Sequence, residues 1–296
     1  MKSYSLKDMH TVVVHDGIFH QDDVNSVATC QLGHELNNLS PLKVIRTSII
    51  RPEWTLENGV VVADVGGGIL DHHESEEQKE RRADGTPFAS FGKTVRLFKK
   101  DLYLDEDTYE VLDEGYIKAL DDHDNNFCGN QLALMTRCYN KQWYEDISEE
   151  EIMERFNFRV MVAKEDLKIK IKWAKSVADV KRIALELLST NKGSKIIWMD
   201  RYVPIGSIQE IKDDPNLLFI GSPSDRGGYQ IVAVRREKEV DGKKISYSNL
   251  LFPKKYRGSK DESVGMTFCH SAGFMACFKT KETAQAFMTV WLNSIN

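Results

Sequence analysis

The first third of the chain alternates short apolar runs with longer segments of mixed polarity. The runs are rich in valine and isoleucine, and such short β-branched runs suit strands that are buried on both faces. These strand candidates are Thr11–Val14, Leu42–Ile45 and Val60–Ala63. Helical spacing of apolar positions is found in the ranges 23–39, 88–104 and 107–122. Strands that alternate with helices predict an α/β domain with a mainly parallel sheet.

The pattern changes near residue 148. Residues 148–190 are rich in Glu, Lys, Ile, Leu and Ala, with acidic residues at the start and Lys192 just beyond the end, as a helix dipole favours. We expect two or three helices there. Strand-like runs then return, a turn is expected at 239–243, and a last helix begins near Lys281. The strand candidates of this part are Lys195–Trp198, Leu217–Ile220 and Tyr229–Val234.

These patterns predict three parts in the chain. We expect an α/β domain in residues 1–147, a helical connector in 148–190 and a smaller α+β domain in 191–296. The length of 296 residues is sufficient for two hydrophobic cores.

Composition and cysteine usage narrow the class of protein. Hydrophobic residues make up 41% and charged residues 29%, which is the balance of an ordinary globular chain. No apolar run reaches the roughly 18 residues of a membrane helix, and the N-terminus lacks the apolar region of a secretory signal. The five cysteines form no CxxC pair, which argues against a disulfide framework or a zinc knuckle. We therefore expect a cytoplasmic protein that does not bind a membrane.

Charge is distributed unevenly along the chain. The net charge is −5, yet residues 190–296 contain 16 Lys and Arg against 11 Asp and Glu, so the excess of negative charge lies before residue 190. An acidic region can supply carboxylates to metals, and a basic region can meet an anionic substrate. Chance variation of surface charge explains the difference equally well.

Histidines and aspartates gather where the first apolar runs end. One cluster follows the first run directly, a second follows the third run and leads into glycines, and a third comes a few residues later. Ligands of open α/β sheets bind beyond the carboxyl ends of the strands, so we expect these clusters to meet at one edge. The clusters are residues 15–23 with His15, His20, Asp22 and Asp23, then Asp64, then Asp71-His72-His73.

This combination of side chains predicts a centre for divalent metals. Imidazole and carboxylate ligands together suit ions such as Mn²⁺, Co²⁺, Fe²⁺ or Zn²⁺. Two ions about 4 Å apart can share one carboxylate and assist in-line attack on a phosphoryl group. Asp64 lies between the other clusters in the sequence and is the natural bridging ligand.

A fourth cluster lies within residues 119–126. Asp121 and Asp124 are three residues apart, so on a helix they share one face, and one of them can complete the ligands of the second metal. Each cluster alone is weak evidence, because such residues often occur in turns and capped loops. Four clusters in this order, two of them at the ends of apolar runs, are much stronger evidence.

Together these motifs resemble the DHH phosphoesterase superfamily and, more closely, its Myg-type family, which is related to the melanocyte-proliferating gene product. The motifs run in the order HxxxxHxD, VxDVGG, DHH and DxxDN, and the resemblance extends to residues 44–47, 256–258 and 268–274. It implies a DHH catalytic domain with a five-stranded, mainly parallel sheet, and a C-terminal substrate-binding domain. The chain departs from the family at Asp23, Asn126 and residues 275–277, and the last departure bears on substrate choice.

The resemblance also implies roles for individual residues. His73 would face the substrate as a general acid or a phosphate contact, and Asp71 would orient the histidines through hydrogen bonds. The implied metal ligands are His15 and His20 for one ion, Asp22, His72 and Asp121 for the other, and Asp64 between them. The implied catalytic residues are Asp64, His73 and His270. The candidates for substrate binding are Arg46, His73, Arg257, His270, Ser271, Gly273 and Lys279.

The expected function is two-metal-dependent hydrolysis of phosphodiester bonds, with 3′–5′ exonuclease action on RNA or short oligonucleotides. Mn²⁺ is the favoured ion, and Co²⁺, Fe²⁺, Zn²⁺ and Mg²⁺ are alternatives. A hydrolase of pyrophosphate or small phosphate esters is the first alternative function, and a non-catalytic metal-binding regulatory protein is the second. The expected partner is a short nucleic acid or a nucleotide, and a homodimer remains open.

Overall fold

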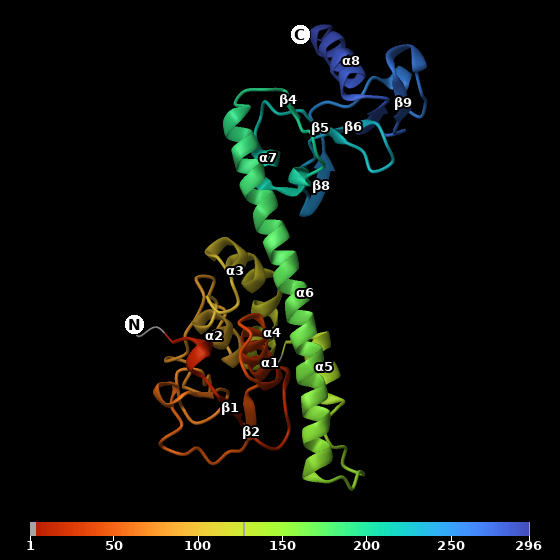
Figure 1. The fold of residues 1–296 in the computed structure, drawn as a ribbon. Helices are drawn as coiled ribbons and strands as arrows, with labels where there is room; N and C mark the ends of the chain where they lie inside the picture. The colour runs from red at the N-terminus through yellow and green to blue at the C-terminus, as the bar shows by residue number, and fades with distance from the viewer. Residues whose placement is uncertain (1–3, 127, 296) are drawn as a thin grey trace. The chain divides into compact units, whose positions relative to one another are not determined.

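The computed structural model describes residues 4–126 and 128–295 and divides the chain into two compact units. The first unit is Met1–Ala178 and the second is Asp179–Asn296. The division falls inside the long helix α6 (Glu149–Thr190), in the segment where the sequence predicted a connector (Figure 1).

The first unit contains a parallel sheet of three strands in the order β2-β1-β3. Thr11 of β1 (Thr11–Val14) pairs with Lys43 of β2 (Lys43–Arg46) on one side and with Val60 of β3 (Val60–Val62) on the other. The predicted parallel α/β architecture is therefore confirmed, with all three strands at the predicted places. The five strands implied by the resemblance are a wrong prediction for the described chain. After β3 the sequence turns glycine-rich and polar, and only the isolated bridge between Ala63 and Leu70 continues the pairing.

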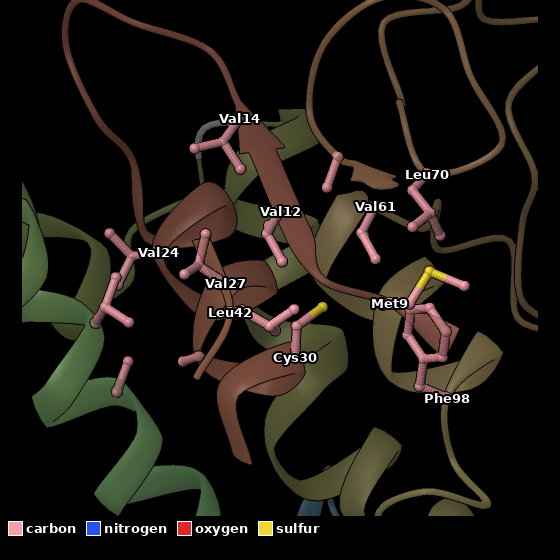
Figure 2. Close-up of a cluster of buried hydrophobic side chains, with 14 of the residues drawn as sticks. Met9, Val12, Val14, Val24, Val27, Cys30, Leu42, Val61, Leu70 and Phe98 are labelled. Atoms are coloured by element: carbon pink, nitrogen blue, oxygen red, sulfur yellow. The ribbon is translucent and has the colours of Figure 1, made fainter. Parts of the chain in front are cut away.

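The sheet and the first helix form the core of this unit. All four residues of β1 are buried, and Figure 2 shows Val12 of β1, Val61 of β3 and Val27 of α1 (Gln21–Leu36) in one cluster. The helix α1 is buried on nearly every side, which explains why its apolar positions follow the helical period only loosely. Its polar first turn is buried as well, and this end of the helix belongs to the candidate site.

Further helices complete the first unit. The predicted helix at 107–122 is confirmed as a continuous run that includes one π-helical turn, whereas the helix predicted at 88–104 is shorter. The segment 149–190 is one helix, not two or three, because it contains no glycine or proline to interrupt it. The remaining elements are η1 (Leu6–Asp8), η2 (Leu56–Asn58), α2 (Ser90–Leu97), α3 (Glu106–Leu112), the π-helical turn η3 (Asp113–Ile117), α4 (Lys118–Asn126) and α5 (Gln131–Arg137).

The second unit is built on a mixed sheet of five strands in the order β4-β5-β6-β10-β9. Only β4 and β5 pair in parallel, and a separate hairpin of β7 and β8 turns at Asp241-Gly242, within the predicted turn. The three predicted strands are confirmed as β4 (Ile196–Trp198), β5 (Phe219–Pro223) and β6 (Tyr229–Ala233). The last helix, α8 (Lys281–Asn293), begins where the sequence predicted.

Four strands of this unit were not predicted, and the two that form the hairpin are charged and mostly exposed, so they lack the apolar signal of a buried strand. These strands are β7 (Arg236–Val240), β8 (Lys243–Tyr247), β9 (Met266–Cys269) and β10 (Met275–Phe278). The short helices of the unit are η4 (Ile205–Ser207), α7 (Gln209–Asp213), η5 (Lys254–Tyr256) and η6 (Glu262–Val264). In the described chain, no helix combines the length and the low charge that a membrane span requires.

Candidate metal centre

Two polar side chains leave the sheet of the first unit at the same edge. His15 follows the last residue of β1, and Asp64 comes two residues after the end of the neighbouring strand β3. The Nε2 atom of His15 lies 3.4 Å from Oδ2 of Asp64. Asp64 is buried and has a left-handed backbone with φ of 59°, a conformation that is uncommon outside glycine and concentrates at functional sites.

The first turn of α1 adds two buried carboxylates to this edge. His20 is the N-cap residue, and its backbone N–H donates to Oδ1 of Asp23 at 3.0 Å. The other oxygen of Asp23 lies 3.3 Å from Nε2 of His15. Asp22 accepts the N–H groups of Ser90 and Phe91 at 3.0 and 2.8 Å, so the N-terminus of α2 fixes its carboxylate.

The loop Asp71-His72-His73 is ordered by its own aspartate. Asp71 Oδ1 accepts the N–H of His72 at 2.8 Å and lies 2.7 Å from the ring Nδ1 of His73, while Oδ2 accepts the N–H of Gly67 at 2.6 Å. Lys93 donates to the carbonyl oxygen of Asp71 at 2.5 Å. The ring of His72 is thereby turned inward and buried, whereas the side chain of His73 is 63% exposed.

The ligand atoms of these clusters converge at His72 and Asp64. Nε2 of His72 lies 3.0 Å from Oδ1 of Asp64 and 3.0 Å from Oδ2 of Asp124. Among the described residues, three groups have potential ligand atoms within 4.8 Å of one another, and Asp64 belongs to two of them. The groups are His15 with His20 and Asp64, Asp64 with His72 and His73, and Asp22 with His72 and Asp124.

The arrangement of these side chains is better explained by a bound metal ion than by hydrogen bonds among the side chains themselves. Nε2 of His72, Oδ1 of Asp64 and Oδ2 of Asp23 are buried, yet none has a hydrogen-bond partner among the described residues. Buried polar atoms without partners are rare and call for an unseen partner such as an ion. Because these atoms point at shared space and are imidazole nitrogens and carboxylate oxygens, they suit divalent cations of the Mn²⁺ to Zn²⁺ series.

The fourth cluster places Asp124, not Asp121, beside His72. Asp121 is fully buried, its Oδ2 pairs with Nη2 of Arg82 at 2.7 Å, and its Oδ1 accepts the N–H of Gly92 at 3.1 Å. Arg82 also pairs with Asp113 at 2.6 Å. Asp121 therefore belongs to a structural ion-pair cluster, and the choice of Asp121 as ligand is replaced by Asp124, the alternative from the same helical face.

Burial and mutual charge shift the pKa values of the clustered groups. Burial alone would raise the pKa of Asp64, but the nearby rings of His15 and His72, whose Nε2 atoms lie 3.4 and 3.0 Å from its carboxylate, outweigh it and lower the pKa to about 2. Burial would lower the pKa of His72, but Asp124 and Asp64 raise it to about 11. Burial raises the pKa of Asp23 to about 8. Protons thus reside on some of these groups near neutral pH, and a bound cation would replace them.

A cavity of about 330 Å³ opens directly beside this cluster. Three histidines of the candidate centre, His20, His72 and His73, line this cavity. Arg137 and Asn125 line it as well; Asn125 ends the DxxDN motif, whereas Arg137 was not singled out in the sequence. No sequence signal could have found Arg137, because it is an ordinary last-turn helix residue in a segment without other candidate ligands.

Arg46 occupies a supporting position at the end of β2. Its Nη2 donates to the carbonyl oxygen of Gly17 at 2.7 Å, and its guanidinium lies 5.3 and 4.7 Å from the ring centroids of Phe19 and Phe156. These contacts hold the loop between His15 and His20 in place. A direct role of Arg46 in substrate binding stays a prediction.

The remaining candidates for substrate binding lie in the second unit. Arg257 donates from Nε to the carbonyl oxygen of Phe252 at 2.8 Å and packs against Gly273, whose φ is 75°. His270 accepts the N–H of Ala272 at 3.1 Å, and its ring centroid lies 4.3 Å from that of Phe274. Ser271 is exposed, and Lys279 lines a separate cavity of this unit. Contacts of these residues with substrate stay predictions.

Comparison with known proteins adds one finding. The family model MYG1_exonuc, described as Uncharacterised protein family (UPF0160), matches residues 11–292. No curated protein matches the chain.

Proposed function

Because the chain belongs to the MYG1_exonuc family, we propose that it is a two-metal phosphoesterase of the DHH type that acts as an exonuclease on RNA or short oligonucleotides. The family name points to exonuclease-like, metal-dependent activity. One observation carries the proposal furthest: Asp64 belongs to two adjacent groups of ligand atoms, and its Oδ1 is buried without a hydrogen-bond partner among the described residues. A carboxylate that belongs to both groups could serve both ions of a two-metal centre, whose ions lie about 3.5–4 Å apart.

Each of the two ions would have its own ligands. His15 and His20 would hold one ion, Asp64 would bridge, and the second ion would be held by Asp22, His72 and Asp124. Mn²⁺ is the favoured ion for this mixture of imidazole and carboxylate. When bound, the ions would supply positive charge for the phosphoryl oxygens and would lower the pKa of an attacking water.

His73 is the candidate for the general acid that protonates the leaving oxygen. Its Nδ1 faces Asp71 at 2.7 Å, and this hydrogen bond raises the pKa of His73. The ring is exposed and lines the cavity beside the cluster. A His73 imidazolium can therefore donate its Nε2 proton to the oxygen that leaves when the phosphodiester bond breaks, while Asp71 keeps the ring oriented.

A second candidate function is hydrolysis of pyrophosphate or a small phosphate ester. The cavity of about 330 Å³ favours it, because this volume is close to the lower end of the roughly 300–1,000 Å³ that small-ligand sites occupy. The same volume also admits the terminal nucleotide of a chain. Substrate comparison, not cavity size, has to separate the two functions.

The test compares substrates with and without a chain end. Purified full-length protein is incubated with Mn²⁺ and a 3′-labelled or 5′-labelled linear oligoribonucleotide, a circular oligoribonucleotide of the same sequence, pyrophosphate and small phosphate esters. We expect mononucleotide release from the linear chain, no cleavage of the circle, and no activity in EDTA. The Asp64→Ala variant, purified in the same way, controls for contaminating nucleases. Turnover of the small esters alone would select the second function, and turnover of none would reject both.

A further inference from the structure

Arg137 presents an unpaired positive charge to the cavity beside the candidate metal centre. It is the last residue of α5, its side chain is exposed, and it lines the same cavity as His20, His72 and His73. Its guanidinium makes no hydrogen bond or ion pair with any described residue, although its backbone carbonyl accepts the N–H of Asn140. Apart from the histidines of the cavity, its other basic side chain is Lys79, which is already paired with Glu76 at 2.6 Å. Arg137 is therefore the cavity's available partner for an anion.

A buried polar network fixes the end of α5 that carries Arg137. Its neighbour Thr136 contacts Oε1 of Gln21, the residue that follows His20 at the start of α1. Arg159 of α6 donates from Nη2 to Oγ1 of Thr136 at 2.9 Å and to Oε1 of Gln21 at 3.2 Å. Gln21, Thr136 and Arg159 are all buried. Buried networks with satisfied partners are rigid. The backbone of Arg137 is therefore held at a fixed distance from the candidate ligand His20.

Asn125 offers a second, complementary group to the same cavity. Its Nδ2 donates to the carbonyl oxygen of Asp121 at 3.0 Å, which fixes the orientation of the amide. Its Oδ1 is buried and has no hydrogen-bond partner among the described residues. An acceptor that is buried without a donor is costly, so this oxygen requires a donor from a ligand or water. A sugar hydroxyl is a donor of the required kind.

We propose that this cavity binds one ribonucleotide unit of the substrate, with a phosphate on the guanidinium of Arg137 and a sugar hydroxyl donating to Oδ1 of Asn125. The inference deepens the proposed function and rests on it. The planar guanidinium suits phosphate oxygens because it can donate two parallel hydrogen bonds. The volume of about 330 Å³ lies in the range of small-ligand sites and suits a single nucleotide unit.

Binding of a mononucleotide tests the role of Arg137 without any turnover. The affinity of full-length, Mn²⁺-loaded protein for adenosine 5′-monophosphate is measured by calorimetry. We expect Arg137→Gln to raise Kd about 10- to 100-fold, because a charge-assisted contact is lost, and Arg137→Lys to recover part of the affinity. Arg96→Gln is the matched control, since Arg96 pairs with Glu80 at 2.5 Å and does not line the cavity. A Kd for Arg137→Gln equal to that of the control would overturn the phosphate contact.

The hydroxyl contact is tested with deoxynucleotides. Wild-type protein should bind the ribonucleotide about 5- to 10-fold more tightly than the 2′-deoxy or the 3′-deoxy analogue, and Asn125→Ala should remove this preference. Equal affinity of the wild-type protein for all three ligands would overturn this contact.

The nucleotide-binding site and the proposed hydrolytic function can be rejected independently of each other. Protein that binds the nucleotide through Arg137 but hydrolyses no phosphodiester rejects the proposed function and leaves the binding site intact. Protein that hydrolyses oligoribonucleotides with the same KM and the same nucleotide Kd in the Arg137→Gln variant retains the function and rejects this site.

Discussion

The loops around Asp64 and around His270 show how differently two similar clusters can be used. Both follow a strand and both combine histidine with small residues. Around Asp64, buried nitrogen and oxygen atoms converge and stay without hydrogen-bond partners among the described residues. Around His270, the polar groups are engaged within their own unit, since His270 accepts the N–H of Ala272 and Arg257 donates to the carbonyl oxygen of Phe252.

The difference teaches that residue type does not identify a ligand site by itself. Buried polar atoms are normally paired, so the cluster that is left unpaired is the one prepared for an additional partner. The loop around His270 has contacts that stabilise its own fold, and any role in substrate binding would be added to these. Substitutions in the two regions test this contrast between a centre whose ligand atoms are unpaired and a loop whose polar groups are already hydrogen-bonded.

The largest effect is expected for Asp64→Ala. Removal of the shared carboxylate should lower kcat/KM by at least about 1,000-fold, because metal stabilisation supplies several kcal/mol to phosphoryl transfer. It should also abolish the rise in thermal midpoint that Mn²⁺ causes in wild-type protein. Asp84→Ala serves as a control, because Asp84 is an exposed partner of Lys118 outside the cluster. Full Mn²⁺ stabilisation of the Asp64→Ala variant would contradict the assignment.

Asp124→Asn and Asp121→Asn should separate metal binding from structure. Asp124→Asn should reduce activity about 100-fold and leave the free energy of unfolding in EDTA nearly unchanged, since it removes one negative charge from a group of like charges. Asp121→Asn should lower the free energy of unfolding by about 2–3 kcal/mol, because it breaks a buried pair with Arg82. Urea unfolding measures the stability and Mn²⁺ titration measures the metal affinity of both variants. Weak Mn²⁺ binding by Asp121→Asn together with normal binding by Asp124→Asn would identify Asp121 as the ligand.

Metal binding should release protons and strengthen as the pH rises. Burial would lower the pKa of His15, but Asp64 and Asp23 raise it to about 9, and burial raises the pKa of Asp23 to about 8. Both groups therefore carry protons at pH 7 in the metal-free protein, and a cation must displace them. Calorimetry in buffers with different ionisation enthalpies should show net release of protons at pH 7 and a smaller release at pH 9. A binding enthalpy independent of buffer would contradict this linkage.

The smallest effect is expected in the second unit, for Gly273→Ala. A Cβ at this position would lie 2.4 Å from Nε of Arg257, and φ is 75°, so both contact and backbone strain destabilise the variant. Gly242→Ala, with φ of 72° and open space around it, gives the cost of the backbone conformation alone. Gly273→Ala should lower the free energy of unfolding about 1–2 kcal/mol further than this control, with Mn²⁺ affinity unchanged. A loss of Mn²⁺ affinity would tie this loop to the metal centre.

The sequence by itself determined the local elements and the place of the chemistry. Short runs rich in valine and isoleucine favour strands, and β1, β2 and β3 lie where these runs occur, although only β1 is buried along its whole length. Since parallel strands bring their carboxyl ends to one edge, His15 and Asp64 could be expected to meet before any coordinates were known. The richness of residues 148–190 in Glu, Lys, Ile, Leu and Ala also indicated helix, although not that it is a single continuous one.

Only the tertiary structure decided which of several equivalent residues faces the centre. Asp121 and Asp124 share one helical face, and the direction of packing against Arg82 and Gly92 assigns the first to the core and the second to His72. Arg137 has no local signal, because its position depends on the contact of Thr136 with Gln21, residues 115 positions apart in the chain. The number of strands was likewise decided by pairing between distant segments. Local sequence fixes periodicity and burial, whereas long-range packing fixes direction and partners.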